Sequence, residues 1–287
     1  NQWHAHTYYT HLFRNSKKVE LNGRYTHHAI YDETMKFIKD NKDEPFFLYC
    51  PWPPPHAAYQ IPRDEPAWQT YKDKPWGKDA KVAAAMDTMM DRQVGEITAL
   101  LKKTGIYENT LMFFTSDNGA AKRFDGIHNS CGVMQGHKRS LNEGGIRVPM
   151  VVRWPGKIKP GSVSDHPWYF PDVMPTLAEI AGVSKEVPKD IDGISVLPTL
   201  LGKGEQKQHE YMYWQFGVRA ARSGKWKGIG KGGHLYLYDL SKDMAEKNDV
   251  SAKHPEIAAK FKHYITDGYR EPRSQKDDGK YTGKAKK

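Results

Sequence analysis

Four polar residues lie beside short apolar runs of this sequence and could do chemistry together. His56 follows the first run, Asp117 and Asn118 follow the second, and Lys138 precedes the third. In open α/β sheets, ligands collect at the carboxyl ends of the strands, so polar residues at such positions are the first candidates for a site. Together they offer oxygen donors for a cation and positive groups for an oxyanion.

Asp117 and Asn118 place a carboxylate beside an amide carbonyl. Both are hard oxygen donors of the kind that Ca²⁺ or Mg²⁺ binds. The alternative is a hairpin, because Asn-Gly is a strong turn dipeptide and Gly119 comes next. The preceding run, 111–115, is typical of a strand buried on both faces, and no second strand follows at once, which favours the metal site. Ca²⁺ takes about 6–8 oxygens, so other ligands must come from elsewhere.

Lys138 and His56 are candidates for binding an anion. Lys138 would set a fixed positive charge against an anion whose charge rearranges during transfer, although by its type alone it could equally be a surface lysine. His56 could contact an anionic group or give a proton to a leaving oxygen near neutral pH, or be a solvated loop residue without a role. The remaining histidines have no H-E-x-x-H or similar spacing, so the sequence gives no support for a zinc site.

Helices and apolar runs alternate between residues 32 and 182 and would position these side chains. We expect helices over 32–40, 78–103 and 171–181, and strands over 46–49, 111–115 and 148–154. This alternation predicts an α/β fold with a mostly parallel sheet that helices cover on both faces.

The pattern changes after about residue 208. Short alternating runs separated by glycine turns predict a smaller antiparallel sheet with strands over 211–216, 218–222, 226–229 and 235–240. A helix over 255–265 would cover it. We therefore expect an α/β domain over 1–207, a small C-terminal α+β subdomain over 208–268, and a basic tail over 269–287.

Composition limits the partners without choosing one. The chain has a net charge of +10 and favours anionic partners in general, but its charge is not gathered into the single basic stripe of a nucleic-acid reader. No apolar run approaches the ~18 residues of a membrane span. The two cysteines, Cys50 and Cys131, are too few for a disulfide framework. The sequence carries no signal for an oligomeric state.

Several short blocks of the sequence also match one family in order. They cover 44–49 with 55–56, then 90–95, 115–119, 136–138, 143–149, 153–156 and 172–177. The sequence resembles the type I, formylglycine-dependent sulfatases, arylsulfatase-like members of the alkaline-phosphatase-like superfamily. Residues 224–227 and 237–240 look like the small C-terminal sheet of that family.

The resemblance implies a role for each candidate residue. It gives Asp117 and Asn118 the positions of two calcium ligands, with Ca²⁺ preferred to Mg²⁺. It gives Lys138 and His56 the positions of side chains that contact the sulfate group. The implied reaction is hydrolysis of a sulfate ester by a formylglycine made from cysteine or serine. A sulfate ester is the expected substrate; the sequence favours sugar sulfates and aryl sulfates equally, and the resemblance suggests a sulfated carbohydrate. The resemblance also implies a periplasmic or secreted location, although no signal is visible in the sequence.

The sequence departs from the family at the nucleophile. The family carries it in a C-x-P-S-R segment near the N-terminus, after a paired Asp-Asp of calcium ligands. Cys50 is followed by Pro51-Trp52-Pro53, and Cys131 by Gly-Val-Met, so neither stands in that motif. We expect that a long N-terminal stretch of family sequence precedes Asn1, with the formylglycine nucleophile in it, and that this chain is inactive alone.

Two other functions fit some of the same features. A relative in the superfamily that acts on phosphate esters, as a hydrolase or transferase, would also use a calcium-type site and a lysine. The blocks at 143–149 and 153–156 favour sulfate. A non-catalytic protein that binds polyanions would agree with the net charge of +10, and its affinity would fall steeply with salt.

Overall fold

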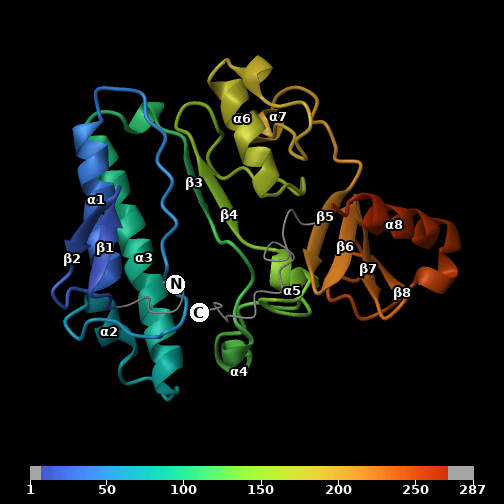
Figure 1. Cartoon of the computed structure of the whole chain (residues 1–287), viewed down its shortest axis with the longest axis horizontal. Coiled ribbons are helices and arrows are strands. Elements are labelled where there is room, and N and C mark those ends of the chain that lie inside the picture. The colour runs from blue at the N-terminus through green and yellow to red at the C-terminus, as the bar shows by residue number, and fades with distance from the viewer. Residues whose placement is uncertain (1–7, 271–287) are drawn as a thin grey trace. The chain divides into compact units, whose positions relative to one another are not determined.

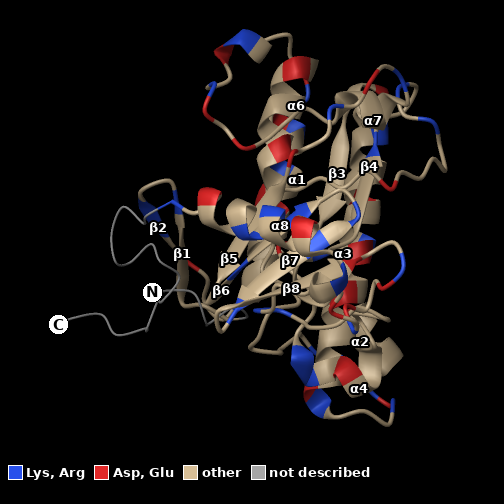
Figure 2. Cartoon of the chain, turned by 90° about the vertical axis from the view of Figure 1, so that its right-hand side faces the viewer, with Lys and Arg blue, Asp and Glu red and all other residues tan. Residues whose placement is uncertain are grey.

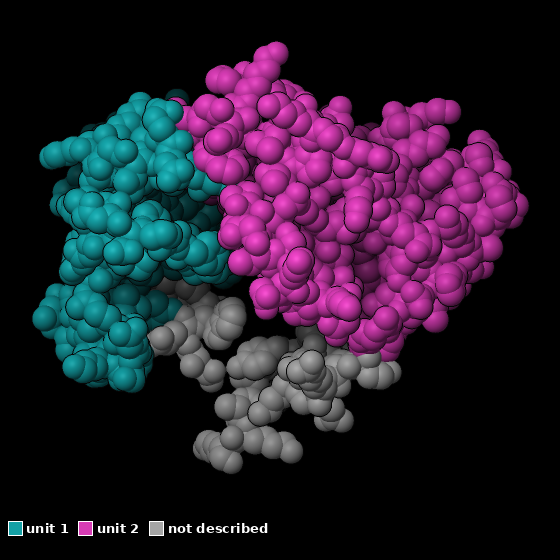
Figure 3. Space-filling model, turned by 90° about the horizontal axis from the view of Figure 1, so that it is seen from above, with its two compact units in different colours: residues 1–111 teal, residues 112–287 magenta. Residues whose placement is uncertain are grey.

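The computed structural model describes residues 8–270, and the chain divides into two compact units, residues 1–111 and 112–287 (Figure 3). Our expected domains over 1–207 and 208–268 were drawn from sequence patterns and stay a prediction. Most of the expected basic tail lies outside the described residues.

The first unit consists of helices and one small hairpin. Its elements are β1 (His11–Arg14), β2 (Lys17–Glu20), α1 (Thr26–Asp40), α2 (Pro66–Tyr71), α3 (Lys78–Lys103) and the short helix η1 (Tyr107–Asn109) (Figure 1). The helices predicted over 32–40 and 78–103 are confirmed. Helix α1 begins earlier than predicted, and its first turn buries Thr26 and His27.

The core of this unit lies along one stripe of α3. The apolar residues of the helix recur at spacings of three and four, which places them on the same face. The buried cluster contains Tyr25, Ile61, Ala67, Val82, Ala85, Met86 and Met89.

The strand predicted over 46–49 is wrong. The structure assigns no strand there, and Phe47 and Tyr49 are 71% and 69% exposed. The run is short and lies between Pro45 and Pro51. A strand needs a neighbour to bond its backbone, and none of the strands within residues 8–270 pairs with this run.

The second unit begins with a two-stranded sheet. Strand β3 (Met112–Thr115) pairs with β4 (Met150–Arg153), and both were predicted. Strand pairs within residues 8–270 are all antiparallel, so the parallel part of the expected sheet has no counterpart in this stretch. The chain between β3 and β4 contains only short helices, whereas a parallel return usually needs a long crossover helix.

One face of this pair is open. We expected 111–115 to be buried on both faces, but Phe114 is 40% exposed, and Val151, its cross-strand partner, is 60% exposed. Phe113, on the other face, contacts the ring of Trp168. The expectation of two buried faces is therefore wrong for the described residues, where this side of the strands is not covered.

The remaining helices of the second unit are short. They are η2 (Lys122–Phe124), α4 (Asp125–His128), α5 (Glu143–Ile146), η3 (Phe170–Asp172), α6 (Val173–Ile180), η4 (Ser184–Glu186), α7 (Leu197–Leu201) and η5 (Ser251–Lys253). Helix α6, together with η3, confirms the helix predicted over 171–181.

The structure confirms the predicted small antiparallel sheet at the C-terminal end of the chain and the helix that covers it. Its four antiparallel strands, in spatial order, are β5 (Met212–Phe216), β6 (Val218–Ser223), β7 (Trp226–Lys231) and β8 (His234–Asp239). Helix α8 (Pro255–Asp267) packs across one face, where Phe261 lies against Leu235 and Leu237. The other face holds Leu141 against Ala220 and Ile229 and lies beside α5 (Figure 1).

Charges are dispersed over the elements. Figure 2 shows Lys and Arg scattered among Asp and Glu along the helices and loops, in agreement with the sequence. Within residues 8–270, no helix is both long and apolar enough to span a bilayer.

The close approach of α8 to β7 depends on a glycine. A Cβ at Gly228 would lie 2.7 Å from Cδ1 and 2.9 Å from Cβ of Phe261. We expect Gly228→Ala to lower the free energy of unfolding by about 1–3 kcal/mol, because overpacking forces the helix away from the sheet. Urea denaturation measures this loss. Gly126→Ala is the control, since its Cβ meets no atom within 4 Å, and an equal loss in both variants would contradict the prediction.

Candidate functional site

Two chain segments meet at the end of β3. The N–H of Gly119 donates to the carbonyl of Gly145 at 2.9 Å, and the N–H of Lys138 donates to the carbonyl of Ala120 at 2.8 Å. The structure thereby brings the segment of Asp117 and Asn118 against the loop that carries Lys138. We call this pair of backbone contacts, between 117–120 and 135–145, the loop clasp.

The alternative of a hairpin at Asn118-Gly119 is wrong. A two-residue hairpin turn would lead straight into a paired strand, but β4, the partner of β3, begins only at Met150. The N–H of Gly119 is bonded across to the distant Gly145. Asp117 is exposed and Asn118 is half-buried, so both oxygens lie at the end of the strand where the sequence placed them.

Glycines make the loop clasp possible. A Cβ on Gly119 would lie 1.9 Å from the carbonyl oxygen of Gly144, and a Cβ on Gly144 would lie 2.3 Å from that of Gly136. A Cβ on Gly145 would lie 2.1 Å from the carbonyl oxygen of Ser140. Atoms cannot approach so closely, so the glycine at 119 lets the two segments touch, and the glycines at 144 and 145 let the loop over 135–145 fold closely on itself.

Lys138 is held in an unusual stretch of backbone. Gly136 has a φ of +82° and Arg139 a φ of +74°, both in the left-handed region. A residue with a Cβ adopts this region at a cost of about 1–2 kcal/mol. Such residues persist where the surrounding structure holds them, often at functional sites. The half-buried Lys138 thus lies between a glycine that adopts this region freely and an arginine that adopts it at a cost.

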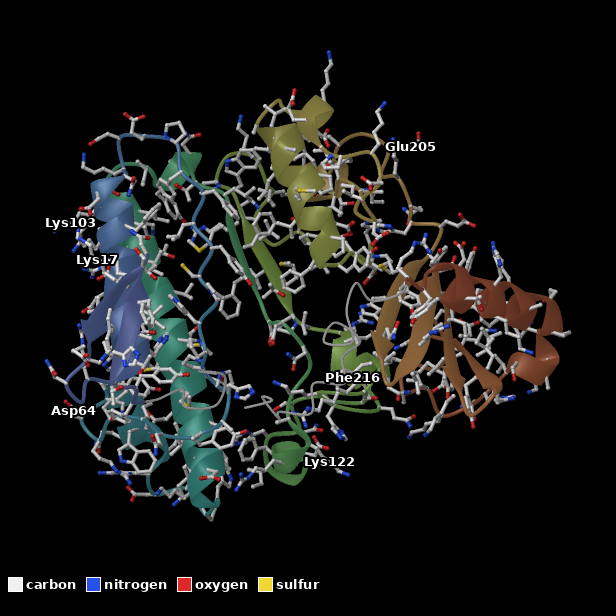
Figure 4. All side chains as sticks on the ribbon, in the orientation of Figure 1. Lys17, Asp64, Lys103, Lys122, Glu205 and Phe216 are labelled. Atoms are coloured by element: carbon white, nitrogen blue, oxygen red, sulfur yellow. The ribbon has the colours of Figure 1, made fainter. Side chains whose placement is uncertain are left out.

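A small hollow opens at Gly136 and His137, the two residues before Lys138 in the chain. It has a volume of about 230 Å³, and its polar lining includes Asp125, Asn129 and His137. The Nδ1 of His137 lies 3.9 Å from a carboxylate oxygen of Asp125. Lys122 in Figure 4 marks the helical turn that leads into this region. The lining offers hydrogen-bond donors and acceptors, which suit a ligand rich in hydroxyl groups.

The loop behind Lys138 rests on a buried carboxylate. Glu143 begins α5 and is 1% exposed. Burial by itself raises the pKa of a carboxyl group, but Lys227, Arg222 and Arg147 reverse this and hold the pKa of Glu143 below its ordinary value. Glu143 is therefore an anion inside the protein. The sequence did not reveal that Glu143 is a buried anion, although Lys227 at an inward position of a predicted strand was a visible signal.

His56 lies in the first unit, in the proline-rich loop after 46–49. It is exposed, and its Nδ1 lies 2.7 Å from the carbonyl oxygen of Ala57. Its role stays a prediction.

The donors for calcium are suitable in kind. Asp117 and Asn118 supply the oxygen atoms that Ca²⁺ prefers, but two are fewer than the ion requires. Within residues 8–270, no group of three or more His, Cys, Asp or Glu side chains could hold a metal ion. Calcium binding therefore stays a prediction.

Cys50 and Cys131 are free cysteines, and the buried Sγ of Cys131 donates to the carbonyl of Gly144.

Comparisons with known proteins agree on one family. The family profile described as Sulfatase matches residues 1–183. A second profile, described as N-sulphoglucosamine sulphohydrolase, C-terminal, matches residues 135–270. The loop clasp and Lys138 lie within the first match, and the C-terminal sheet lies within the second.

Two curated sulfatases are similar to this chain over most of its length. N-acetylgalactosamine-6-O-sulfatase of Bacteroides thetaiotaomicron is 30% identical over 266 residues, which cover 82% of this chain and 49% of the relative. Steryl-sulfatase of Rattus norvegicus is 34% identical over 191 residues, which cover 63% of this chain and 31% of the relative. The chain thus spans about a third to a half of the length of these curated relatives.

Solved structures have the same architecture. The protein Ps i-CgsB superposes with a TM-score of 0.81 at 29% identity, over 95% of this chain and 60% of that chain. The same protein in complex with k-i-k-neocarrahexaose gives a TM-score of 0.80.

The unusual backbone of Arg139 can be tested by itself. We expect Arg139→Gly to raise the free energy of unfolding by about 0.5–1 kcal/mol, because glycine removes the cost of the left-handed conformation and adds a smaller entropic cost. Denaturant unfolding measures the change. Lys122→Gly, in the helical turn η2, should lower stability instead. A loss of stability in Arg139→Gly as large as that in Lys122→Gly would show that the backbone at 139 is not strained.

Proposed function

The chain belongs to the sulfatase family, and on that premise we propose that it supplies the sulfate-binding and calcium-binding part of a sulfuric ester hydrolase that acts on sulfated carbohydrate. The observation that supports this most is the loop clasp. It joins Gly119 and Ala120, the residues directly after Asp117 and Asn118, to Gly145 and Lys138 of a loop some twenty residues further along the chain. The proposed cation site and the proposed anion site would thus lie on two segments that backbone hydrogen bonds hold together.

Lys138 is the proposed sulfate contact. Its ammonium group would offer hydrogen bonds to the sulfate oxygens and offset the negative charge that grows there as the ester bond breaks. The backbone N–H of Lys138 is bonded to Ala120, and this would hold the lysine close to its place before the substrate arrives, so that less reorganisation is needed during the reaction.

Asp117 and Asn118 are the proposed calcium ligands in this chain, through a carboxylate and an amide oxygen. When bound, Ca²⁺ supplies a concentrated positive charge toward the sulfate oxygens. His56 is proposed to contact the ester and to give a proton to the leaving oxygen, a task that suits an imidazole near neutral pH.

The nucleophile is not among the residues assigned here. The family resemblance gives it to a formylglycine, and neither Cys50 nor Cys131 stands in the corresponding motif. We propose that this chain by itself binds sulfate esters without cleaving them. Turnover would then require a segment that carries the nucleophile.

A carbohydrate is the proposed carrier of the sulfate. The relative named for N-acetylgalactosamine 6-sulfate matches 82% of this chain, whereas the steryl-sulfatase of the rat matches 63%. Ps i-CgsB, which is similar over 95% of this chain, has been solved with a neocarrahexaose. The polar hollow lined by Asp125, Asn129 and His137 offers partners for sugar hydroxyls.

Binding to the chain tests this function directly. Isothermal titration with N-acetylgalactosamine 6-sulfate, in the presence of Ca²⁺, should give a measurable affinity, and the unsulfated sugar should bind far more weakly. Lys138→Ala should weaken binding of the sulfated sugar by about tenfold or more, because a charge-assisted hydrogen bond contributes about 1.5–3 kcal/mol. Lys122→Ala is the matched control and should bind as the unchanged chain does.

Three outcomes would contradict the assignment. Equal affinity for the sulfated and unsulfated sugar would remove the sulfate site, and tighter binding of N-acetylgalactosamine 6-phosphate would favour a phosphate ester instead. Affinity for a polyanion that falls steeply with salt and ignores Lys138→Ala would favour a non-catalytic polyanion binder. Release of sulfate, followed by ion chromatography, should occur only when the chain is joined to a nucleophile segment.

The calcium site has its own test. We expect Asp117→Ala to weaken calcium binding by about tenfold or more, because a carboxylate is the strongest ligand type that this segment offers. Calcium titration followed by calorimetry measures the affinity without any reaction. Asp165→Ala, which removes an exposed carboxylate elsewhere in the same unit, should bind calcium unchanged. Equal affinity in both variants would exclude Asp117 as a ligand.

A further inference from the structure

Lys227 is a fully buried amine in the C-terminal sheet. It lies on β7, and its side chain is 0% exposed. Its neighbours in the strand, Trp226 and Gly228, face α8, so Lys227 points to the opposite face of the sheet. A buried ammonium group destabilises the folded protein unless carboxylates pair with it. The partners of Lys227 therefore indicate its structural role.

Two buried carboxylates surround this amine. The Nζ of Lys227 lies 2.8 Å from Oε1 of Glu143 and 3.0 Å from Oε1 of Glu246. The second carboxylate oxygen of Glu246 accepts the backbone N–H of Glu143 at 2.6 Å. Arg222, opposite Lys227 on β6, lies 3.5 Å from the other oxygen of Glu143. We call Lys227, Glu143 and Glu246 the buried ion cluster.

The buried ion cluster holds Glu143, which lies two residues before Gly145 of the loop clasp. Immediately after Glu143, the N–H of Gly144 donates to the carbonyl of Gln135 at 2.8 Å. The next carbonyl, of Gly145, accepts the N–H of Gly119. Movement of Glu143 would therefore shift both sides of the loop that carries Lys138. Figure 4 shows α5 next to the C-terminal sheet, close to the labelled Phe216.

The backbone of Glu246 is held in the same arrangement. Its φ is +52°, which is unfavourable for a residue with a side chain. The side-chain amide nitrogen of Gln135 donates to the carbonyl of Glu246 at 2.8 Å and to the carbonyl of Ala245 at 3.1 Å. The segment that provides Glu246 is therefore fixed to both ends of the loop, at Gln135 and at Glu143.

We propose that Lys227 is a positioning residue for the sulfate site: its buried pairing with Glu143 and Glu246 fixes the loop clasp and, through it, Lys138. The importance of Lys138 rests on the proposed function, but the mechanical coupling between Lys227 and the loop clasp does not. Lys227 itself has no access to substrate, because its side chain is fully buried.

Hydrogen exchange of the chain separates this role from general stability. In Glu143→Gln, which keeps the size of the side chain and an acceptor for Lys227, we expect the amides of Gly119 and Lys138 to exchange about tenfold faster or more. Amides of the β7–β8 ladder should change by less than about threefold, because the sheet remains paired. Lys227→Met should have a larger effect on the same two amides, since it leaves Glu246 without its cation and leaves Glu143 with only the more distant Arg222 and Arg147.

The control uses a second lysine close to β7. Lys225→Met removes a half-exposed amine that pairs with Asp239 and not with Glu143, and it should leave Gly119 and Lys138 unchanged. If the amides of Gly119 and Lys138 exchange no faster in Glu143→Gln, or accelerate by the same factor as the β7–β8 ladder, the inference is overturned. Glu143→Gln also decides the matter if Lys227→Met does not fold.

Sulfate binding gives the second measurement. With N-acetylgalactosamine 6-sulfate as the probe, Glu143→Gln should weaken binding by about threefold to tenfold although Lys138 is intact, and Lys225→Met should not. Unchanged binding alongside faster exchange would overturn the link to Lys138. If the unchanged chain itself does not bind the sulfated sugar, the proposed function fails, and the exchange data still decide the mechanical coupling.

Discussion

The contact between the backbones of Gly119 and Gly145 is the constraint on which the rest of the second unit depends. A Cβ at position 119 would collide with the backbone of Gly144 and Gly145, so the glycine there permits the approach, while Gly144 and Gly145 let the loop over 135–145 fold closely on itself. The contact fixes the end of β3 against the loop of Lys138. Oxygen donors from one stretch and an amine from another can then share a site, although neither stretch has regular structure long enough to hold its side chains alone.

The C-terminal sheet supports this contact from behind. Its two faces have different partners: apolar residues and glycines receive α8, whereas Lys227 and Ile229 face the loop that begins at Leu141. Apolar packing is not directional, so it does not by itself fix the orientation of the loop on the sheet. The buried ion cluster does fix it, because buried charges are stable only when they are paired. A small sheet far from β3 in the sequence thereby becomes part of the framework of the site.

Local patterns predicted the elements well and their pairing poorly. The apolar stripe of 78–103 and the alternation over 212–239 each specify one element, so α3 and the four strands of the C-terminal sheet were predicted. The run at 46–49 is equally apolar but has no partner strand within residues 8–270, and composition cannot reveal the presence of a partner. The direction of the β3–β4 pair also depends on the long connection between the strands, whose path no short pattern determines.

The candidate residues could be named from the sequence, and their roles stay predictions, whereas the residues that support their loop could not be named. Asp117, Asn118 and Lys138 were found from their places beside apolar runs and from the family resemblance. The role of Lys227 was not, because an inward lysine in a strand becomes meaningful only once Glu143 and Glu246 are seen around it. One further property follows from the period of two along β7. A shift of this strand by a single residue would turn the amine of Lys227 toward the ring of Phe261 and leave the two carboxylates facing a glycine. Lys227, Glu143 and Glu246 therefore also disfavour the shifted strand register when the sheet forms.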